Sequence, residues 1–225
     1  MKTMDHIVKA PLDASCLSGI LNPYGEQVSA IIAEHGCTFS SKADAEWGAV
    51  DGLNEQSWAS IMDDLNNKRK ICDRIAREPR VRAFAEHQTG HKLKPFFINK
   101  VRINNPSLSK SRYTWHQDVA TWPGMIEQYP TMKTAKIITF WLCLSISNEG
   151  NGLALLPTEM ETIDHMFVDN QGYFNADVAG VDQDNEIKIF GPSYTAAIFG
   201  QNVLHKSLSG SDTARLSFDL RYYHV

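Results

Sequence analysis

A histidine and an aspartate separated by one residue carry the clearest chemical signal in this sequence: His116 and Asp118. On an extended strand, side chains at positions i and i+2 point to the same face, so an imidazole and a carboxylate would lie side by side. Such a pair suits a shared metal ion, and we choose His205 as the third ligand. Two histidines and one carboxylate on one face of an octahedral ion leave its opposite face open.

The His-x-Asp spacing alone is weak, because it occurs often by chance. A histidine that is hydrogen-bonded within the core, beside an exposed aspartate, is the competing interpretation. Arg215 argues against it, since it lies ten residues after His205 in an apolar, strand-like run. A lone arginine in such a run needs a buried anionic partner, and its planar guanidinium group is suited to a carboxylate.

Further short motifs follow one another in a fixed order. They are residues 103–106, Trp115-His116-Gln117-Asp118, residues 139–144 and 150–157, Phe199-Gly200, His205-Lys206-Ser207 and Arg215. Taken together, they resemble the phytanoyl-CoA dioxygenase-like family of Fe(II)/2-oxoglutarate-dependent oxygenases, over roughly residues 96–225. The resemblance implies that His116, Asp118 and His205 hold Fe(II). It also implies that Arg215 binds the distal carboxylate of 2-oxoglutarate, while Trp141 and Ser207 line the co-substrate site.

Two positions depart from the pattern of the family. Relatives often carry a basic residue where Asn105 stands, so Asn105 is assigned to the co-substrate site with Arg102 or Lys100 as possible substitutes. Pro157 is followed by Thr-Glu-Met instead of Gly-Ser-His. We expect the second departure to affect a loop and to leave the chemistry unchanged.

The resemblance also implies a reaction. It is the hydroxylation of an unactivated carbon of a small metabolite by O₂, with release of succinate and CO₂. Asp118 favours hydroxylation over halogenation, because halogenating relatives replace this carboxylate with a small residue. Desaturation, cyclisation and epimerisation use the same ligands and stay open. We assign Arg102, Trp115 and Trp122 to the substrate site, which favours a polar or carboxylated substrate.

Two other classes of protein could use the same metal-binding residues. A non-catalytic jelly-roll module could keep a metal for structure or sensing. A zinc hydrolase could use the same three ligands, but it would leave Arg215 unexplained. A second metal site at His87 and His91 is disfavoured, since Gly90 lies between them and a surface or loop pair accounts for both.

Length and composition restrict the class of protein further. The 225 residues, 43% hydrophobic and 21% charged, fit one soluble domain over residues 1–225. The formal charge of −4 argues against a dedicated nucleic-acid binder. The sequence shows neither an apolar run long enough to cross a bilayer nor a signal peptide. Four scattered cysteines suit reduced thiols, so we expect a cytoplasmic protein without a membrane partner.

The first 94 residues are expected to give mostly helical support. Residues 1–23 are predicted to be irregular, since Pro11 and Pro23 discourage a long helix. Helical spacing of apolar residues predicts helices over 26–35 and 55–77, and Pro79 begins a further one through about residue 86. Residues 37–53 are either a packing segment or a flap over the site.

From residue 95 the chain is predicted to be β-rich. Expected strands cover residues 96–103, 136–145, 153–156, 186–190, 195–199, 203–206 and 213–223. Short strands separated by turns predict a double-stranded β-helix, a cupin-like jelly roll, with a solvated insertion at 158–185. Such a fold brings distant strands together, which would let His205 reach His116. Trp47, Trp115 and Trp122 are candidates to shield the site from water, with ordinary packing as the alternative.

Overall fold

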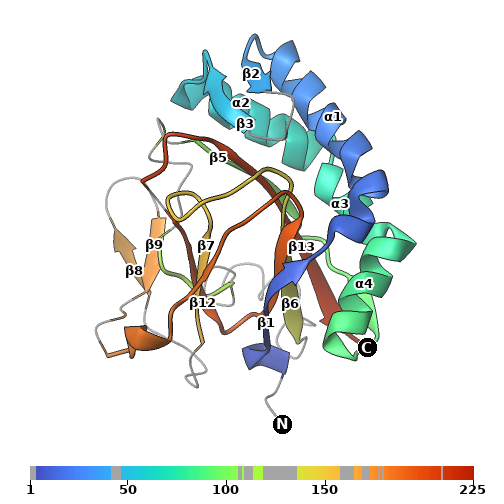
Figure 1. Cartoon of the computed structure of the whole chain (residues 1–225), viewed down its shortest axis with the longest axis vertical. Helices are drawn as coiled ribbons and strands as arrows, with labels where there is room; N and C mark the ends of the chain where they lie inside the picture. The colour runs from blue at the N-terminus through green and yellow to red at the C-terminus, as the bar shows by residue number, and fades with distance from the viewer. Residues whose placement is uncertain are drawn as a thin grey trace.

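The computed structural model describes most of the chain. The described residues are 4–41, 47–105, 108, 114–118, 136–157, 165–168, 173–176, 178, 180–208 and 210–225. They form mostly antiparallel β-sheets with a few helices, and the helices lie together on one side of the sheets (Figure 1). The prediction of a mainly β protein with supporting helices is confirmed. None of the described helices is long and apolar enough to cross a membrane.

The larger sheet has six strands and is organised around its longest strand, β13. The strand order is β1 (Val8–Asp13), β11 (Thr195–Gly200), β6 (Ile137–Cys143), β13 (Arg215–His224) and β4 (Leu93–Pro95), with β5 (Lys100–Asn104) also paired to β13. Every pair is antiparallel. All seven residues of β6 are buried, because this central strand is covered on both faces.

A smaller sheet faces the inner side of the larger one. It contains β10 (Ile187–Ile189), β7 (Leu153–Leu156) and β12 (Leu204–Ser207), in that order. An apolar cluster joins the two sheets. It combines Trp141, Cys143, Ala197 and Phe199 of the larger sheet with Leu153, Leu155 and Ile189 of the smaller one and with Val203. The space between the sheets is therefore partly core, and the remainder is available for a site.

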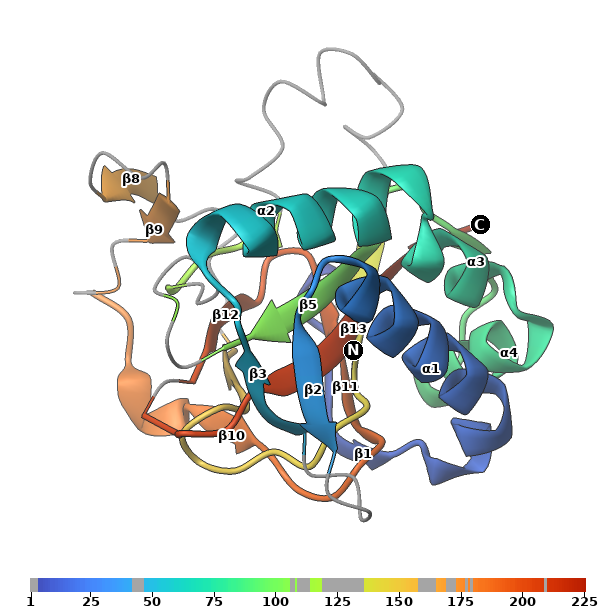
Figure 2. The ribbon, with the colours of Figure 1, turned by 90° about the horizontal axis from the view of Figure 1, so that it is seen from above.

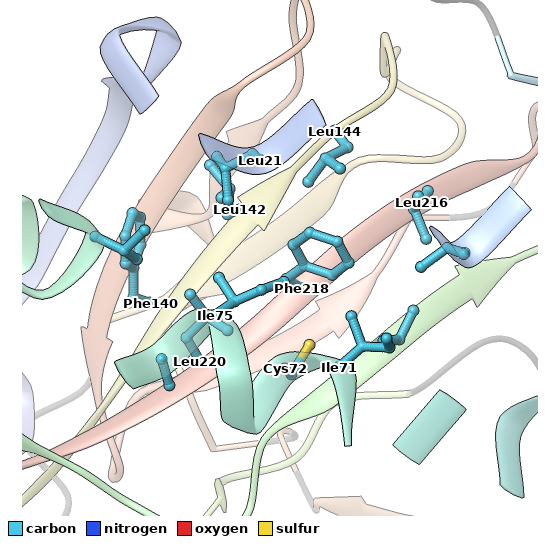
Figure 3. Packing of buried hydrophobic residues seen from close by; sticks show 14 of the residues in the cluster. Leu21, Ile71, Cys72, Ile75, Phe140, Leu142, Leu144, Leu216, Phe218 and Leu220 are labelled. Carbon is cyan, nitrogen blue, oxygen red and sulfur yellow. The ribbon is translucent and has the colours of Figure 1, made fainter. Parts of the chain in front are cut away.

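Helices cover the other face of the larger sheet. They are α1 (Ser18–Glu34), α2 (Glu55–Asp63), α3 (Ile71–Arg77) and α4 (Pro79–Thr89), and Figure 2 shows them on one side of β5 and β13. Figure 3 shows side chains of α1 and α3 meeting those of β6 and β13, with Ile75 beside Phe218 and Leu220. The ring of Phe84 on α4 stacks on Phe140, with centroids 5.5 Å apart.

Strand β13 divides its side chains between the two faces of the sheet. Leu216, Phe218, Leu220 and Tyr222 belong to the apolar core under the helices. The intervening residues are polar or charged, and all of them are buried: Arg215, Ser217, Asp219 and Arg221. Because side chains alternate along a strand, these four point into the space between the sheets. One strand thus supplies both a core surface and a charged inner surface.

The first 23 residues are more regular than we predicted. Strand β1 contains Pro11 and pairs with β11, with a register shift between Lys9 and Leu12. Proline is tolerated there because β1 is an edge strand. Helix α1 begins at Ser18, earlier than predicted, and contains Pro23. Burial of the apolar face of α1 in the main core outweighs the backbone hydrogen bond that proline removes.

The helix predicted over 55–77 is two helices. A π-helical turn, Asp64–Lys68, follows α2, and Lys70 has a left-handed backbone with a φ of 50° before α3 begins. The turn presents Asn66 to the free edge of β5. Its side chain accepts from the N–H of Val101 at 2.7 Å and donates to the carbonyl of Val101 at 3.3 Å. Pairing of this edge strand explains the interruption.

Two helix ends follow the sequence signals closely. Asn54 caps α2 by accepting from the backbone N–H groups of Gln56 and Ser57. Helix α4 begins at Pro79, as predicted, and ends at Gly90, which has a φ of 74°. The remaining described helices are short 3-10 turns at Met4–His6, Ser15–Leu17 and Gln183–Asn185.

Two hairpins complete the fold. Strands β2 (Thr38–Ser41) and β3 (Trp47–Asp51) form one of them, within the segment predicted as packing or flap, and a function as a flap stays a prediction. Strands β8 (His165–Val168) and β9 (Tyr173–Ala176) form the other. We predicted a solvated insertion over 158–185 and named no strand in it, so this hairpin is an addition to the predicted strands. Its pairing was hidden because the segment lacks a clear apolar alternation.

Candidate metal centre and adjoining pocket

His116, Asp118 and His205 lie together. One potential ligand atom from each lies within 4.8 Å of the others, and all three residues are buried. Within the described part of the chain, this is the one group of three or more histidine, cysteine or acidic residues with such spacing. His87 is exposed near the end of the helix that covers residues 79–89, and His91 is half-buried just beyond it.

Backbone pairing explains how residues so distant in sequence meet. The N–H of His116 donates to the carbonyl of His205 at 3.0 Å, and the N–H of His205 donates back at 2.9 Å. Opposite residues of an antiparallel pair place their side chains on the same face, and the two imidazole centroids are 4.1 Å apart. The extended strand we predicted through Asp118 is reduced to this one bridge.

Both imidazoles are held in the tautomer that a metal ligand needs. The Nδ1 atom of His116 lies 2.7 Å from the carbonyl of Thr114, and that of His205 lies 3.1 Å from the carbonyl of Val203. A carbonyl oxygen only accepts, so each Nδ1 carries the hydrogen. The lone pair of each imidazole is therefore on Nε2.

The electrostatic environment favours neutral histidines and an ionised aspartate. Burial lowers the pKa of His116 to about 3, with a smaller contribution from His205. Burial also lowers the pKa of His205, against the opposing effect of Asp118. Burial alone would raise the pKa of Asp118, but the charge and the hydrogen bonds of Arg221 outweigh it and lower this pKa. These are the protonation states that bind a metal.

Two residues that we did not predict hold the Asp118 carboxylate. Arg221 donates from Nη2 to Oδ1 at 2.8 Å and from Nε to Oδ2 at 3.2 Å, and Thr139 donates to Oδ2 at 2.6 Å. The sequence contained a signal for Arg221, because it lies six residues after Arg215 and so on the same face of one strand. Thr139 is opposite Arg221 in the pairing of β6 with β13, which required the register of the sheet.

A pocket of about 420 Å³, its opening included, adjoins His116 and His205. Its described lining combines potential ligands, charged groups and apolar side chains: Arg102, His116, Thr139, Trp141, Leu153, Phe199, His205, Lys206, Ser207, Arg215 and Asp219. The pocket therefore brings Arg215, Trp141 and Ser207 together beside the histidines, and their role in binding a co-substrate stays a prediction.

Arg215 is a buried cation without a carboxylate partner among the described residues. It donates from Nη1 to the carbonyls of Asn151, at 2.7 Å, and Gly152. Its guanidinium carbon lies 5.4 Å from the ring centroid of Trp141, and its buried Nε has no hydrogen-bond partner. Burial lowers the pKa of Arg215. An uncompensated buried cation at a pocket is suited to an anionic ligand.

Two other cations line the pocket, Arg102 and Lys206, and each differs from Arg215 because it has a counterion. Arg102 donates from Nε to Oδ2 of Asp219 at 2.9 Å. Lys100 lies opposite Asp219 in the register of β5 with β13, and burial and the neighbouring Arg102 lower its pKa. Arg215 is thus better suited than Arg102 to bind the distal carboxylate of a keto-acid.

The remaining predicted site residues are not among the described lining of the pocket. Asn105 is buried but is not among the described residues that line the pocket. Trp115 packs in a separate cluster with Ala154, Leu156 and Leu204, and the ammonium of Lys206 lies 4.2 Å from its ring centroid. Trp122 lies outside the described residues. The roles assigned to Asn105, Trp115 and Trp122 stay predictions.

The fold is similar to that of several proteins of known structure. One similar structure is the non-heme monooxygenase ThoJ in its apo form, with a TM-score of 0.55 and 17% identity over 98% of this chain and 75% of that chain. Another is EctD from S. alaskensis with 2-oxoglutarate and 5-hydroxyectoine, with a TM-score of 0.54 and 16% identity over 99% of this chain and 73% of that one.

A third similar structure extends the range of reactions. It is SnoN, a non-heme alpha ketoglutarate dependent epimerase from nogalamycin biosynthesis, with a TM-score of 0.53 and 17% identity over 98% of this chain and 77% of that chain. At these identities the likeness shows the fold alone. No protein-family model and no curated protein matches the sequence.

Proposed function

We propose that this protein is an Fe(II)- and 2-oxoglutarate-dependent dioxygenase with a single catalytic domain of double-stranded β-helix type. It hydroxylates an unactivated carbon of a small metabolite, and succinate and CO₂ are released. The observation that carries the proposal is the pocket that joins a buried metal-binding group to the uncompensated Arg215. The likeness to EctD, whose structure contains 2-oxoglutarate, supports the same co-substrate.

The residues of the chain divide the binding of cofactor and co-substrate between them. His116, Asp118 and His205 would hold the ferrous ion, and Arg215 would bind the distal carboxylate of 2-oxoglutarate. Trp141 supports the guanidinium group through its ring face, and Ser207 lines the same part of the pocket. When bound, the ferrous ion supplies the redox chemistry with O₂ that decarboxylates the co-substrate and oxidises the substrate.

The chain also restricts access of water to the site. His116, Asp118 and His205 are each at most 8% exposed, and Phe199 packs on the ring of His205 with centroids 4.7 Å apart. The apolar walls strengthen the attraction between Arg215 and an incoming carboxylate, because the effective dielectric constant is lower than in water. Binding and orientation of the co-substrate therefore need few polar groups.

The substrate is proposed to be polar or carboxylated. The support comes from Arg102 and Asp219, which bring one charge of each sign to the pocket. Asp118 favours hydroxylation over halogenation, because it leaves no vacant position for a halide. Since SnoN is an epimerase of the same fold, product analysis is needed to distinguish hydroxylation from epimerisation, desaturation or cyclisation.

The decisive experiment loads the protein with Fe(II) anaerobically, adds 2-oxoglutarate with a panel of metabolites, and then admits O₂. We expect one class of polar metabolite to stimulate succinate release in the wild type. Binding of 2-oxoglutarate without consumption would instead favour a non-catalytic module. Preferential binding of zinc, without affinity for 2-oxoglutarate, would favour a hydrolase. Either result would overturn the proposal.

A further inference from the structure

We infer that Arg221 and Thr139 are positioning residues that restrict Asp118 to one metal-binding oxygen. The inference rests on the proposed metal site and concerns how the carboxylate meets the ion. Asp118 could offer either one or both of its oxygens. The choice decides how many coordination positions the protein occupies and how many it leaves for co-substrate and O₂.

The hydrogen bonds of the carboxylate distinguish its two oxygens. Each carboxylate oxygen has about two lone-pair directions. Oδ2 accepts from Thr139 at 2.6 Å and from Nε of Arg221 at 3.2 Å, so both of its directions are used. Oδ1 accepts from Nη2 of Arg221 at 2.8 Å and lies 3.9 Å from Nε2 of His205. Metal coordination therefore falls to Oδ1, the oxygen on the histidine side.

Arg221 is itself fixed by contacts that do not involve the site. Its Nη1 donates to the carbonyl of Ile98 at 2.8 Å, and its backbone N–H donates to Oδ1 of Asn99 at 2.6 Å. Asn99 in turn donates to Asp73 on α3 at 2.7 Å. The side chain of Arg221 is 4% exposed. A guanidinium group held this firmly sets the plane of the carboxylate before a metal arrives.

The consequence concerns the number of coordination positions that the protein would leave open on the ion. This number matches what the proposed reaction needs. Two Nε2 atoms and one Oδ1 occupy three of the six positions of an octahedral ion. Three positions stay open, which suffices for a keto-acid bound through two oxygens and one further ligand. A carboxylate bound through both oxygens would take a fourth position and compete with the co-substrate. Arg221 and Thr139 thus prevent that competition.

The test compares Arg221→Gln, Arg221→Lys and Thr139→Val with the wild type after loading with Co(II), whose absorption spectrum reports coordination geometry. We expect the Co(II) spectrum to change in Arg221→Gln and in Thr139→Val. We also expect the affinity of the Co(II) protein for 2-oxoglutarate to fall by roughly tenfold or more. Arg221→Lys keeps the charge but cannot donate a bidentate pair of hydrogen bonds to the Asp118 carboxylate, so it should not restore the wild-type spectrum.

Arg69→Gln is the matched control. Arg69 also donates from Nε to a mostly buried carboxylate, Asp64, at 3.2 Å, and Asp64 does not belong to the metal-binding group. Its loss should lower the melting temperature and leave the Co(II) spectrum unchanged. A change of stability alone is therefore separated from a change at the metal.

Each result decides the inference. Wild-type Co(II) spectra and 2-oxoglutarate affinities in Arg221→Gln and Thr139→Val overturn it, as does full restoration by lysine, which would show that charge alone matters. If Arg221→Gln does not fold, Thr139→Val decides, because valine keeps the shape of the buried side chain. If the wild type binds no Co(II), the proposed metal site fails and this inference fails with it. If the wild type binds Co(II) and the variants show the same spectra and affinities, this inference fails and the proposed metal site stands.

Discussion

Three buried or largely buried arginines share the space between the two sheets, and their partners differ. Arg221 is paired with Asp118 and Arg102 with Asp219, at 2.8 Å and 2.9 Å. Arg215 is bonded to backbone carbonyls and has no carboxylate partner among the described residues. A buried cation without a counterion lowers the stability of a fold unless a ligand compensates it. The difference supports the proposed anion-binding role of Arg215 over the same role for Arg102.

The first prediction concerns Arg215→Met. We expect the affinity for 2-oxoglutarate to fall by roughly tenfold or more, because a charge-assisted hydrogen bond contributes about 1.5–3 kcal/mol. Metal affinity should change little. Titration of the metal-loaded protein with 2-oxoglutarate measures the effect. Arg102→Met is the comparison variant, and a larger loss there than in Arg215→Met would show that Arg102 binds the distal carboxylate.

The second prediction concerns Asp118→Ala. The variant should lose metal binding, and the free energy of unfolding of the metal-free protein should fall by about 3–5 kcal/mol, because Arg221 is left as an uncompensated buried charge. Urea denaturation and metal titration measure the two effects. In the double variant Asp118→Ala/Arg221→Met, stability should recover in part while metal binding stays lost. Recovery of metal binding would contradict the assignment of Asp118 as a ligand.

At the scale of elements, sequence patterns predicted a helix or strand correctly where one strong local signal defined it. Helix α4 has proline at its start and glycine at its end, and β6 is apolar at every position except Thr139. They failed where a long-range contact decided the outcome. The break after α2 depends on Asn66 reaching β5, and β1 depends on pairing with β11. Neither partner can be inferred from the local sequence.

The third prediction tests the backbone of that helix break. Lys70 is exposed and has a φ of 50°, a conformation that costs a residue with a side chain roughly 1–2 kcal/mol. Lys70→Gly should therefore raise the free energy of unfolding by about 0.5–1 kcal/mol, after the greater flexibility of glycine in the unfolded chain is counted. Urea denaturation measures the change. Lys68→Gly, within the π-helical turn, is the control and should destabilise the protein.

The fourth prediction concerns the turn that seats Arg215. A methyl group at Gly152 would overlap the carbonyl oxygen of Ile189, and the carbonyl of Gly152 accepts from Arg215. Gly152→Ala should separate β7 from β10 locally, lower stability by about 1–3 kcal/mol and weaken binding of 2-oxoglutarate. Gly19→Ala in α1 is the control, since nothing lies within 4 Å of its added methyl group. That control should be neutral or slightly stabilising, and equal effects of both variants on 2-oxoglutarate binding would refute the proposed seat.

At the scale of the whole molecule, the site depends on register between strands that are distant in sequence. The convergence of His116, Asp118, His205 and Arg215 was predictable because their residue types are unusual in apolar or motif-rich runs. Thr139 and Arg221 were missed, because their roles follow from the pairing of β6 with β13 and from the approach of Asp118 to that pair. The even spacing of Arg221 from Arg215 indicates only that both lie on one face of the strand, and the contacts with Asp118 leave no signal in the chain.

The last prediction follows from the contribution of both sheets to the proposed metal site. Thr139 and Arg221, which hold Asp118, belong to the larger sheet, and His205 belongs to the smaller one, so an ion bound by this group links both. At a metal concentration one hundred times the dissociation constant, binding should stabilise the fold by about 2.7 kcal/mol. For a chain of this size, that corresponds to a rise in melting temperature of roughly 5–10 °C.

Hydrogen exchange locates this stabilisation within the molecule. The amides of His116 and His205, which bond to each other's carbonyls, should exchange more slowly once metal is bound, together with the rest of β12. Amides of α1, on the far side of the larger sheet, should change least, since no α1 residue contacts the site. Asp118→Ala should abolish the difference between the two regions. Equal slowing of exchange in β12 and in α1 would contradict this prediction. It would mean that metal binding does not link the two sheets at His116 and His205, because such a link slows exchange first at the backbone bridge between these residues.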